Sequence, residues 1–376
     1  MTLPLNDIIV LEFCQYLSGP SAGLRLADLG ARVIKIESAR GDACRKLAIE
    51  NLWADENDSL LFHTINRNKE SFIANLKDEI EVAQIKKLIA KADVMIHNFR
   101  PGVMEKLGLG FEEAQKINPE IVFAEVSGYG SDGPWNKKPG QDLLLQAKSG
   151  LMFTSGNQDN PPVPFGLAIG DILCGAQLVQ GILAALIRKE KTGKGAKLEL
   201  SLLESLLDFQ FELLTTYYAS GKLPERSEVS NGHPLLGAPY GLHQTSDGYI
   251  AIAMVPLIDL AETIDCSALL SYSETDLFEK RDEIKTVLGE HLKGGTSGYW
   301  LDKLRSKDLW AMELTDWKTL MGSNGYKELK FEQKLTNGKY ATKCPIRINR
   351  QNLRSERPAP KLGADTADII KEFGLN

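Results

Sequence analysis

Strand and helix patterns alternate from the start of the chain, and this order constrains the fold more than any other feature of the sequence. Ile8–Phe13 is a short apolar run rich in β-branched residues, and the Gly- and Pro-containing loop Cys14–Pro20 follows it. Ser21–Leu29 has the apolar spacing of a helix, and Ala31–Glu37 is the next strand. Such a unit joins two parallel strands by a right-handed crossover, and ligands bind beyond the carboxyl ends of these strands.

The same alternation continues over the first two hundred residues. It predicts strands at Ser71–Leu76, Asp93–Phe99, Ile121–Val126 and Lys197–Ser201, and helices at Glu79–Ala90, Phe111–Ile117 and Asp171–Lys189. The fold class is therefore α/β with a parallel sheet.

A second long helix is predicted after Ser201 and runs through Leu213, and the pattern changes beyond it. Ser220–Gly237 has no periodicity and is a plausible exit from a first domain. A hairpin pattern around Ser246-Asp247-Gly248 then opens a smaller domain. Lys339–Asn349 has the pattern of a strand pair, and a capped helix is expected from Asp365 onward.

Charge and hydropathy exclude two classes of partner. The 376 residues include 44 Lys and Arg against 50 Asp and Glu, a formal net charge of −6, whereas nucleic-acid-binding proteins are typically basic. The first residues contain no basic region, and no apolar run approaches the ~18 residues that span a bilayer. We therefore expect a cytoplasmic protein that binds neither nucleic acid nor a membrane.

The cysteines and histidines indicate neither disulfides nor a metal. The number of cysteines is odd, and none has C-x-x-C spacing, which predicts reduced thiols at Cys14, Cys44, Cys174, Cys266 and Cys344. The five histidines stand singly, without H-x-x-x-H or H-x-H spacing, so we expect no metal site.

The loop after the first strand imitates a dinucleotide-binding turn. It holds Gly19 and Gly23, and Glu37 ends the second strand about 20 residues on, where an acid binds ribose in such sites. The full G-x-G-x-x-G pattern is absent. Nicotinamide or flavin binding is therefore disfavoured.

Basic residues lie close to several predicted strands. NRNKE (66–70), NFRPG (98–102) and Lys106 would place positive charge near strand ends, where a phosphate-bearing ligand binds through helix N-termini and Arg or Lys donors. The alternative is that NFRPG forms a proline-initiated turn and that Lys69 and Lys106 lie on a solvated face. Composition alone favours this alternative.

Asp171 lies in the Gly-flanked segment AIGDILCG at the start of a long apolar helix. Propensity predicts an N-cap whose carboxylate accepts N–H groups of the first turn. A carboxylate at a helix start is also kept ionised by the helix dipole and can act as a nucleophile, and the two roles are compatible. Asp142, in PGQDLLLQAKSG, is more simply a helix cap than a catalytic residue.

A set of motifs in a fixed order carries a family resemblance. The chain contains LEFCQYLSGPSAG, GARVIKIE, NRNKES, ADVMIHNFRPG, GDILCGAQLVQGILAAL, KTGKG and RPAPKLGADT. Together these motifs resemble the family III CoA-transferases of the CaiB/BaiF type, a superfamily that also contains α-methylacyl-CoA racemases. The resemblance spans essentially the whole chain and is thinnest between Met254 and Lys343.

The resemblance implies a fold and an assembly. It implies a large Rossmann-like domain built from both ends of the chain, residues 1–220 together with 340–376, and a small α+β domain over 221–339. It also implies an interlocked homodimer.

The resemblance further implies acyl-CoA:carboxylate CoA-transfer through a covalent aspartyl-CoA intermediate on Asp171. CoA and acyl-CoA are then substrates, a small carboxylic acid is the acceptor, and no cofactor is permanently bound. Backbone N–H groups near Gly170 would stabilise the tetrahedral oxyanions. The ligand contacts of the family fall on Tyr16, Leu17, Ser18, Ala74, Asn75, Lys77, Asn98, Arg100, Lys106, Gln141 and Asp142. Where many members have an Arg, this chain has Ser38; either the nearby Arg40 takes its place or binding on the adenine side is weaker.

Two other functions stay open at this stage. A racemase needs a base on each face of its substrate. At the position of the racemase His this chain has Gln141, and at the position of the Glu that supports that His it has Val255. A non-catalytic CoA-binding protein on the same scaffold is the other alternative. The segment Asn231–Gly237 does not match the glycine-rich loop of formate/oxalate transferases, which disfavours that substrate pair. A dicarboxylate or a carnitine-like acid is then the expected acceptor.

Overall fold

A computed structural model describes residues 3–56 and 58–375, and the chain divides into two compact units. The first unit comprises residues 1–145, 168–209 and 329–376, and the second comprises 146–167 and 210–328. The second unit thus includes the segment 146–167, which the expected boundaries had left in the large domain. Arg226 attaches this segment, because its guanidinium donates to the carbonyl oxygens of Ser155, Gln158 and Asn160 at 2.7–3.0 Å.

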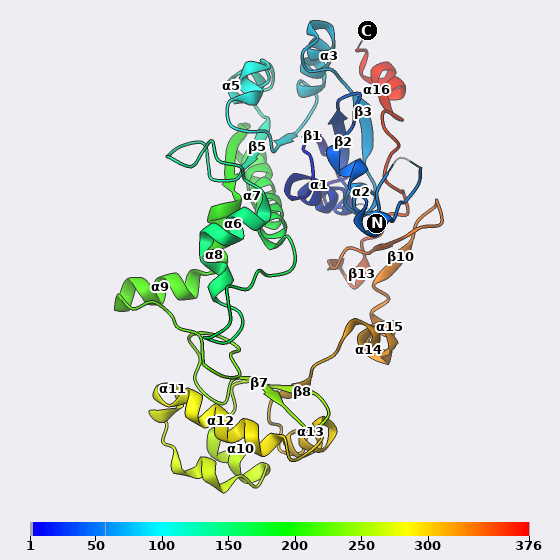
Figure 1. Ribbon diagram of the computed structural model, residues 1–376. Coiled ribbons are helices and arrows are strands. Elements are labelled where there is room, and N and C mark those ends of the chain that lie inside the picture. Colours follow the sequence, from blue (N-terminus) through cyan, green and yellow to red (C-terminus); the bar gives the residue numbers. More distant parts are fainter. Residues whose placement is uncertain (1–2, 57, 376) are drawn as a thin grey trace. The chain divides into compact units, whose positions relative to one another are not determined.

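A six-stranded sheet forms the centre of the first unit (Figure 1). Its order is β3-β2-β1-β4-β5-β6, and every pair is parallel. The strands are β1 (Ile9–Phe13), β2 (Arg32–Glu37), β3 (Glu70–Ile73), β4 (Val94–His97), β5 (Val122–Ser127) and β6 (Ala196–Ser201). This order confirms the predicted α/β class and places the change of direction between β1 and β4, where ligands bind in such sheets.

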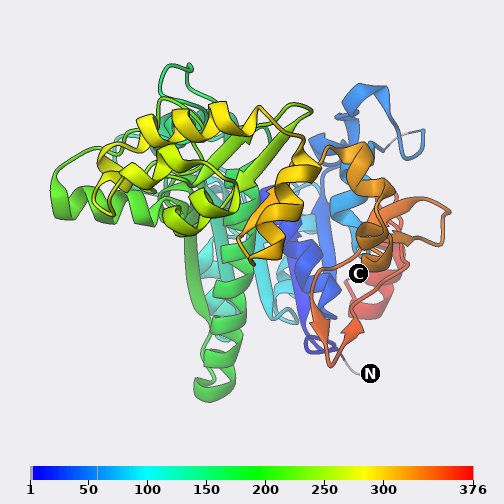
Figure 2. The same ribbon diagram turned by 90° about the horizontal axis from the view of Figure 1, so that it is seen from below.

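Helices cover both faces of this sheet. On one face, α3 (Glu79–Ile89), α4 (Val103–Lys106), α5 (Phe111–Ile117) and α16 (Thr366–Phe373) pack against the apolar core that contains Leu11 and Phe123. On the other face lie α1 (Ser18–Asp28) and α7 (Ile169–Thr192), which contact each other (Figures 1 and 2). The first unit also contains α2 (Leu60–Asn66) and α8 (Leu202–Phe209), together with the first half of α6 (Asp142–Ser149), since the boundary between the units falls after residue 145.

Helix α7 corrects the expectation that no segment has the length and hydropathy of a membrane span. Among the described residues it is the one helix that is long and apolar enough to cross a membrane, with a mean hydropathy of 1.6. The same composition is typical of a helix that covers a sheet in a water-soluble protein. In this fold α7 packs on α1, α8, β5 and β6, which buries Leu178 and Ile182 but leaves Ile172 and Ile187 exposed.

The carboxyl-terminal segment covers the free edge of β3. The backbone N–H of Ser71 donates to the Asp365 carboxylate at 2.8 Å, and the N–H of Ile73 donates to the Thr366 hydroxyl at 3.0 Å. The N–H of Asp365 in turn donates to the carbonyl of Ser71. Asp365 therefore does not cap its own helix, as the sequence suggested, but satisfies the edge strand.

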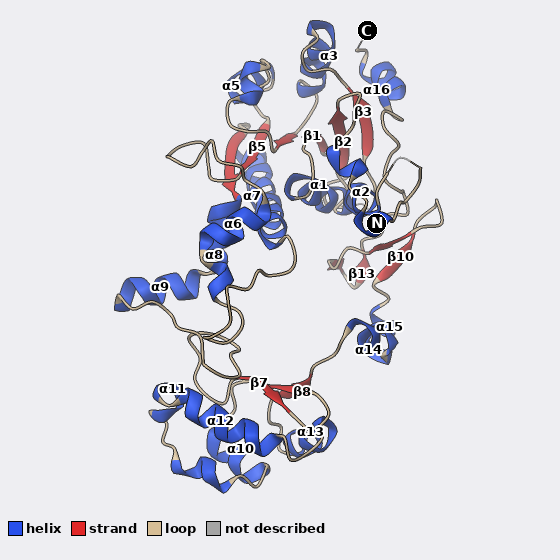
Figure 3. Cartoon of the chain, in the orientation of Figure 1, coloured by secondary structure: helices blue, strands red, loops and turns tan. Residues whose placement is uncertain are grey.

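The second unit is built on a three-stranded antiparallel sheet (Figure 3). The predicted hairpin is confirmed by β7 (Gly241–Gln244) and β8 (Tyr249–Ile252), and β9 (Ala311–Glu313) completes the sheet. The helices of this region are α9 (Phe211–Ser220), α10 (Leu257–Thr263), α11 (Asp276–Glu279), α12 (Arg281–Leu292), α13 (Ser297–Ser306), α14 (Trp317–Gly322) and α15 (Asn324–Leu329).

Two short hairpins return the chain to α16. They are β10 (Glu332–Lys334) with β11 (Tyr340–Thr342), and β12 (Arg347–Ile348) with β13 (Gln351–Asn352). The strand pair expected within Lys339–Asn349 is therefore wrong in its pairing, because β11 and β12 each pair with a different neighbour.

Candidate active site

The loop that follows β1 has its backbone held at consecutive residues. The Asn98 side chain bonds both backbone groups of Gln15, at 2.9 Å to the N–H and 2.7 Å to the carbonyl. The N–H of Tyr16 donates to Asp42 Oδ1 at 3.2 Å. Tyr16 has a φ of +62° and an exposed side chain. A non-glycine residue held in the left-handed region is a typical feature of functional loops.

The predicted CoA contacts all follow the carboxyl ends of neighbouring strands or the helix that comes next. Leu17 precedes α1, Ser18 is its first residue, and Ala74 is buried directly after β3. The parallel topology brings these positions to one edge of the sheet. The exposed residues of the set are Tyr16 after β1, Arg40 after β2, Asn75 and Lys77 after β3, Arg100 after β4, Lys106 at the end of α4, and Gln141 before α6.

Gly128 and Gly140 bring the Gln141-Asp142 pair to the same edge. Gly128 directly follows β5, and a Cβ added to Gly128 would lie 2.6 Å from the Cα of Gly140. Only glycines permit two backbones to pass this closely. The start of α6 therefore lies beside the carboxyl end of β5.

Asp171 lies in the first turn of α7, beside the first turn of α1. Gly175 permits this contact, because a Cβ there would lie 2.3 Å from Ser21 Oγ and 2.8 Å from the carbonyl oxygen of Ser18. Ser18 forms hydrogen bonds to the Asp171 carboxylate through its side chain and its backbone. The helix contact thus joins the candidate nucleophile to the loop that follows β1.

The environment of Asp171 raises the pKa of its carboxyl group to about 6. Burial is the largest cause, the negative charge of Asp142 adds to it, and the hydrogen bonds from Ser18 oppose both. The group is ionised at neutral pH, yet its carboxylate is less stabilised than one in water. Such a carboxylate is suited to nucleophilic attack.

Asp142, not Asp171, satisfies the start of α7. Its Oδ1 accepts the backbone N–H groups of Gly170 at 2.7 Å and of Asp171 at 3.2 Å, and residue 168 at the N-cap position makes no side-chain cap. The N-cap role predicted for Asp171 is therefore wrong. The expectation that N–H groups near Gly170 stabilise oxyanions also needs correction, because Asp142 already occupies those donors.

Lys69 contradicts the interpretation of NRNKE as a phosphate-binding or solvated segment. Its side chain is fully buried, and its ammonium group contacts Glu12 at 2.8 Å, Asn66 at 2.9 Å and the carbonyl of Pro20 at 2.9 Å. Glu12, Lys35 and Asp42 are buried with it, and we had not singled them out from the sequence. The available signal was a charged residue inside each of two apolar strand patterns.

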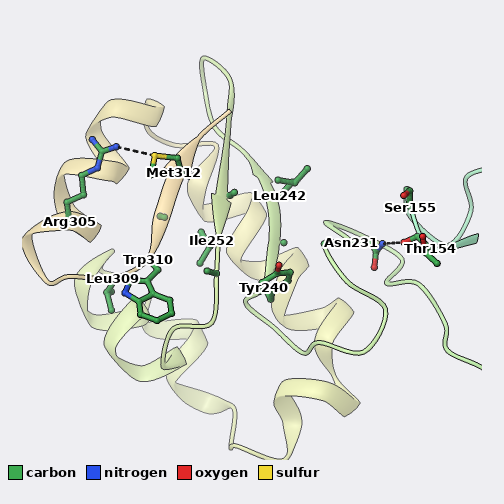
Figure 4. Close-up of a pocket in the computed structure, with 16 residues that line it drawn as sticks. Thr154, Ser155, Asn231, Tyr240, Leu242, Ile252, Arg305, Leu309, Trp310 and Met312 are labelled. Atoms are coloured by element: carbon green, nitrogen blue, oxygen red, sulfur yellow. Dashed lines mark hydrogen bonds between the residues drawn. The ribbon is translucent and has the colours of Figure 1, made fainter. Parts of the chain in front are cut away.

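The second unit has a separate cavity of about 770 Å³ (Figure 4). Its floor includes Leu242, Ala251 and Met312, which are neighbours across β7, β8 and β9, and Trp310 and Tyr240 lie at its sides. The residues that line this cavity include none of the ligand contacts predicted from the sequence.

The remaining side-chain chemistry is sparse. All five cysteines are buried free thiols. Among the described residues, no group of three or more His, Cys, Asp and Glu side chains is arranged to hold a metal ion.

Comparison with known proteins gives a consistent family. A model of CoA-transferase family III matches residues 5–366. The chain is 33 % identical over 382 residues to the acetyl-CoA:oxalate CoA-transferase of Acetobacter aceti, covering 98 % of this chain and 96 % of that protein. It is 31 % identical over 389 residues to the human succinyl-CoA:glutarate CoA-transferase, covering 98 % and 86 %.

The fold agrees with the sequence comparison. The crystal structure of a CaiB/BaiF family protein from Brucella suis superimposes with a TM-score of 0.85 at 30 % sequence identity, covering 99 % of this chain and all of that one. With a parallel sheet that presents an aspartate beside the loop after its first strand, the chain belongs to CoA-transferase family III, the CaiB/BaiF family, and is an enzyme of the EC 2.8.3 class.

Proposed function

We propose that this enzyme transfers CoA from an acyl-CoA donor to a small carboxylate acceptor through the side chain of Asp171. An oxygen of the Asp171 carboxylate attacks the thioester carbonyl carbon, the C–S bond breaks, and CoA leaves as a thiolate, which gives a mixed anhydride between Asp171 and the donor acid. The thiolate then attacks the side-chain carbonyl carbon of Asp171. The donor acid leaves as a carboxylate, and an aspartyl-CoA thioester remains. The acceptor carboxylate reverses these steps and leaves as its CoA thioester.

The observation that carries this proposal is the contact between Asp171 and Ser18. It joins a partly desolvated carboxylate to the N-terminal turn of α1, next to the loop on which the family's CoA contacts fall. Helix N-termini and their hydroxyl donors favour developing negative charge. Because Asp142 occupies the N–H groups of Gly170 and Asp171, Ser18 is the donor that we assign to the oxyanion formed at the Asp171 side chain.

The relatives support a dicarboxylate acceptor. The bacterial relative is named for oxalate and the human relative for glutarate, both of which are dicarboxylic acids. We therefore propose a short dicarboxylate as acceptor and a small acyl-CoA as donor. A panel of acetyl-CoA and succinyl-CoA with oxalate, succinate and glutarate tests this choice.

Chemical trapping tests the covalent step. The enzyme is incubated with a turning-over acyl-CoA and treated with borohydride, which reduces an aspartyl thioester to an alcohol, or with hydroxylamine, which converts it to a hydroxamate. Peptide mass spectrometry should locate the change on Asp171. The same digest monitors the neighbouring carboxylate Asp142 and the exposed Asp208. Modification of Asp142, or full turnover by Asp171→Ala, would overturn the proposal.

Racemase chemistry is the alternative activity, and it is distinguished from CoA transfer by proton exchange at the α-carbon of the acyl group. Gln141 is exposed and carries no titratable group, and Val255 is a buried aliphatic side chain. Neither residue can exchange a proton with a substrate. Incubation of a 2-methylacyl-CoA in heavy water should therefore give no deuterium at the α-carbon.

We further propose that the enzyme acts as a cytoplasmic homodimer. Its free thiols suit a reducing compartment. The family resemblance implies this assembly, and Tyr218, Trp310 and Trp317 leave 62–79 % of their surface exposed and available to a second chain. Light scattering during size-exclusion chromatography measures the mass in solution, and a monomer would contradict the proposed assembly.

A further inference from the structure

Four buried charged residues lie beneath the loop that follows β1. Glu12 on β1 and Lys35 on β2 are register partners, Lys69 precedes β3, and Asp42 follows β2. The first three are fully buried, and Asp42 is 2 % exposed. We name Glu12, Lys35, Asp42 and Lys69 the bracing cluster.

Ion pairs connect the bracing cluster internally. Glu12 divides its two carboxylate oxygens between the lysines, with Oε1 at 3.1 Å from Lys35 and Oε2 at 2.8 Å from Lys69. Asp42 Oδ2 lies 2.9 Å from Lys35. Buried ion pairs of this kind recover their desolvation cost only when their remaining donors and acceptors are also satisfied.

Backbone groups of the loop and of α1 supply those remaining partners. Lys35 donates to the carbonyl of Cys14 at 2.7 Å, and Lys69 donates to the carbonyl of Pro20 at 2.9 Å. Asp42 Oδ1 accepts the N–H of Tyr16. The cluster thus holds the chain immediately before Leu17 and Ser18 and immediately after them.

Close packing makes this arrangement rigid. A Cβ on Gly23 of α1 would lie 1.8 Å from Glu12 Oε2, and a Cβ on Gly19 would lie 2.2 Å from Cys14 Sγ. Helix α1 therefore rests directly on the charged side chains. The left-handed conformation of Tyr16 is unfavourable for a side chain of its size and persists only where the surroundings impose it.

We infer that Lys35 and Asp42 are positioning residues that hold the segment from Cys14 to Ser18 in the conformation that binds CoA. They act through the backbone of this segment and touch no reacting atom. The inference rests on the proposed function, because it takes this segment as the CoA site and Ser18 as the partner of Asp171.

A buried ion pair elsewhere provides the matched control. Asp28 is the last residue of α1, at the opposite end from Ser18, and its carboxylate pairs with Arg67 at 2.5 and 3.0 Å. Both side chains are at most 1 % exposed. Loss of this pair lowers stability as loss of the Lys35–Asp42 pair does, but it leaves the CoA loop alone.

Calorimetric titration with free CoA tests the inference in the full-length enzyme. Asp42→Asn keeps the shape of the side chain and removes its charge, and Lys35→Met removes the donor to Cys14. Each should weaken CoA binding by about tenfold, the change that corresponds to the loss of one charge-assisted hydrogen bond. The double variant should weaken it little further, because both residues hold the same loop. Asp28→Asn should lower Tm and leave CoA affinity unchanged.

The same titrations separate the possible failures. If Lys35→Met does not fold, the CoA affinity of the isosteric Asp42→Asn variant still tests the inference. Unchanged CoA affinity in Asp42→Asn, with a fall in Tm like that of Asp28→Asn, would assign a merely structural role and overturn the inference. Arg100→Ala tests the site itself: if neither this variant nor Asp42→Asn weakens CoA binding, the proposed CoA site and the inference fail together. Because free CoA binding needs no acyl transfer, failure of the covalent step at Asp171 alone leaves this readout valid.

Discussion

Asp142 places a carboxylate oxygen 2.7 Å from the backbone nitrogen of Gly170 and 3.2 Å from that of Asp171. Asp142 thus accepts two N–H groups that would otherwise lack a partner at the start of α7. Its negative charge also raises the pKa of the Asp171 carboxyl group. The start of the helix and the reactivity of its aspartate are consequently coupled.

Asp142→Asn should shift the acid limb of the pH profile to lower pH. The asparagine oxygen can still accept the two N–H groups, so α7 keeps its cap, while the like charge that raises the Asp171 pKa is lost. The measurement is kcat/KM against pH, in which the wild-type enzyme should lose activity as the pH falls through about 6. An unmoved acid limb would show that the limb belongs to another group.

Asp171→Asn should make the folded enzyme more stable above pH 6. Because the Asp171 pKa is raised from 3.8 to about 6, the folded chain binds more protons than the unfolded chain between these values. The free energy of unfolding therefore decreases as the pH rises through this window and stays lower above it. Removal of the charge should recover on the order of 2 kcal/mol near pH 7.5.

Urea titrations of the two proteins at several pH values check this difference. It should vanish below about pH 3, where the aspartic acid is protonated in both states. Asp208→Asn is the control, because Asp208 is exposed and, in the described contacts, its carboxylate accepts only the side chain of the half-buried Gln177. A constant difference at all pH values would indicate a packing effect instead of a charge effect.

Gly175→Ala should damage the active site, whereas Gly181→Ala in the same helix should not. A methyl group at 175 meets Ser21 Oγ at 2.3 Å and a backbone oxygen at 2.8 Å, so α7 must move away from α1. At 181 the nearest atom is a leucine methyl at 3.5 Å. We expect Gly175→Ala to cost about 1–3 kcal/mol of stability and most of kcat.

The Gly181 variant should be neutral or slightly stabilising, because alanine is the better helix former. Thermal denaturation and steady-state kinetics of both variants provide the comparison. Equal kcat in the two variants would contradict the conclusion that the α1–α7 contact sets the position of Asp171.

Lys77→Ala, Arg100→Ala and Lys106→Ala should each raise the KM for the acyl-CoA donor and leave the KM for the acceptor acid unchanged. All three cations are exposed near strand carboxyl ends, where CoA phosphates would lie. Higher salt should reduce the difference between variant and wild type. Lys91→Ala is the control, because Lys91 is exposed just before β4 and so lies toward the opposite edge of the sheet.

The parallel sheet could be predicted because its signals are local. The strand predicted at Ala31–Glu37 is confirmed at Arg32–Glu37, and the helix predicted at Glu79–Ala90 is confirmed at Glu79–Ile89. Helix α1 begins at Ser18, three residues earlier than its apolar spacing indicates. The first turn of a helix that faces a ligand carries small residues, and hydrophobic periodicity does not detect them.

The partners of charged side chains could not be predicted, because they depend on register and crossover. Lys69 meets Glu12 across 57 residues, and Asp142 meets Gly170 across 28. Capping rules consider only the helix that an acid adjoins, so they assigned Asp171 to its own helix and had no means of assigning Asp142 to another. For the candidate site, the sequence predicted which residue types lie at the strand ends. It did not predict which of these side chains pair with one another.

The cover that residues 363–366 provide for β3 has a consequence for synthesis of the protein. A ribosome releases β3 early, but the groups that occupy its open edge arrive about three hundred positions later, after the whole second unit. Until then the nascent sheet has an unprotected edge, the feature through which growing chains join one another. Low growth temperature or added chaperones should therefore raise the yield of folded enzyme more than the stability of the finished enzyme alone would indicate.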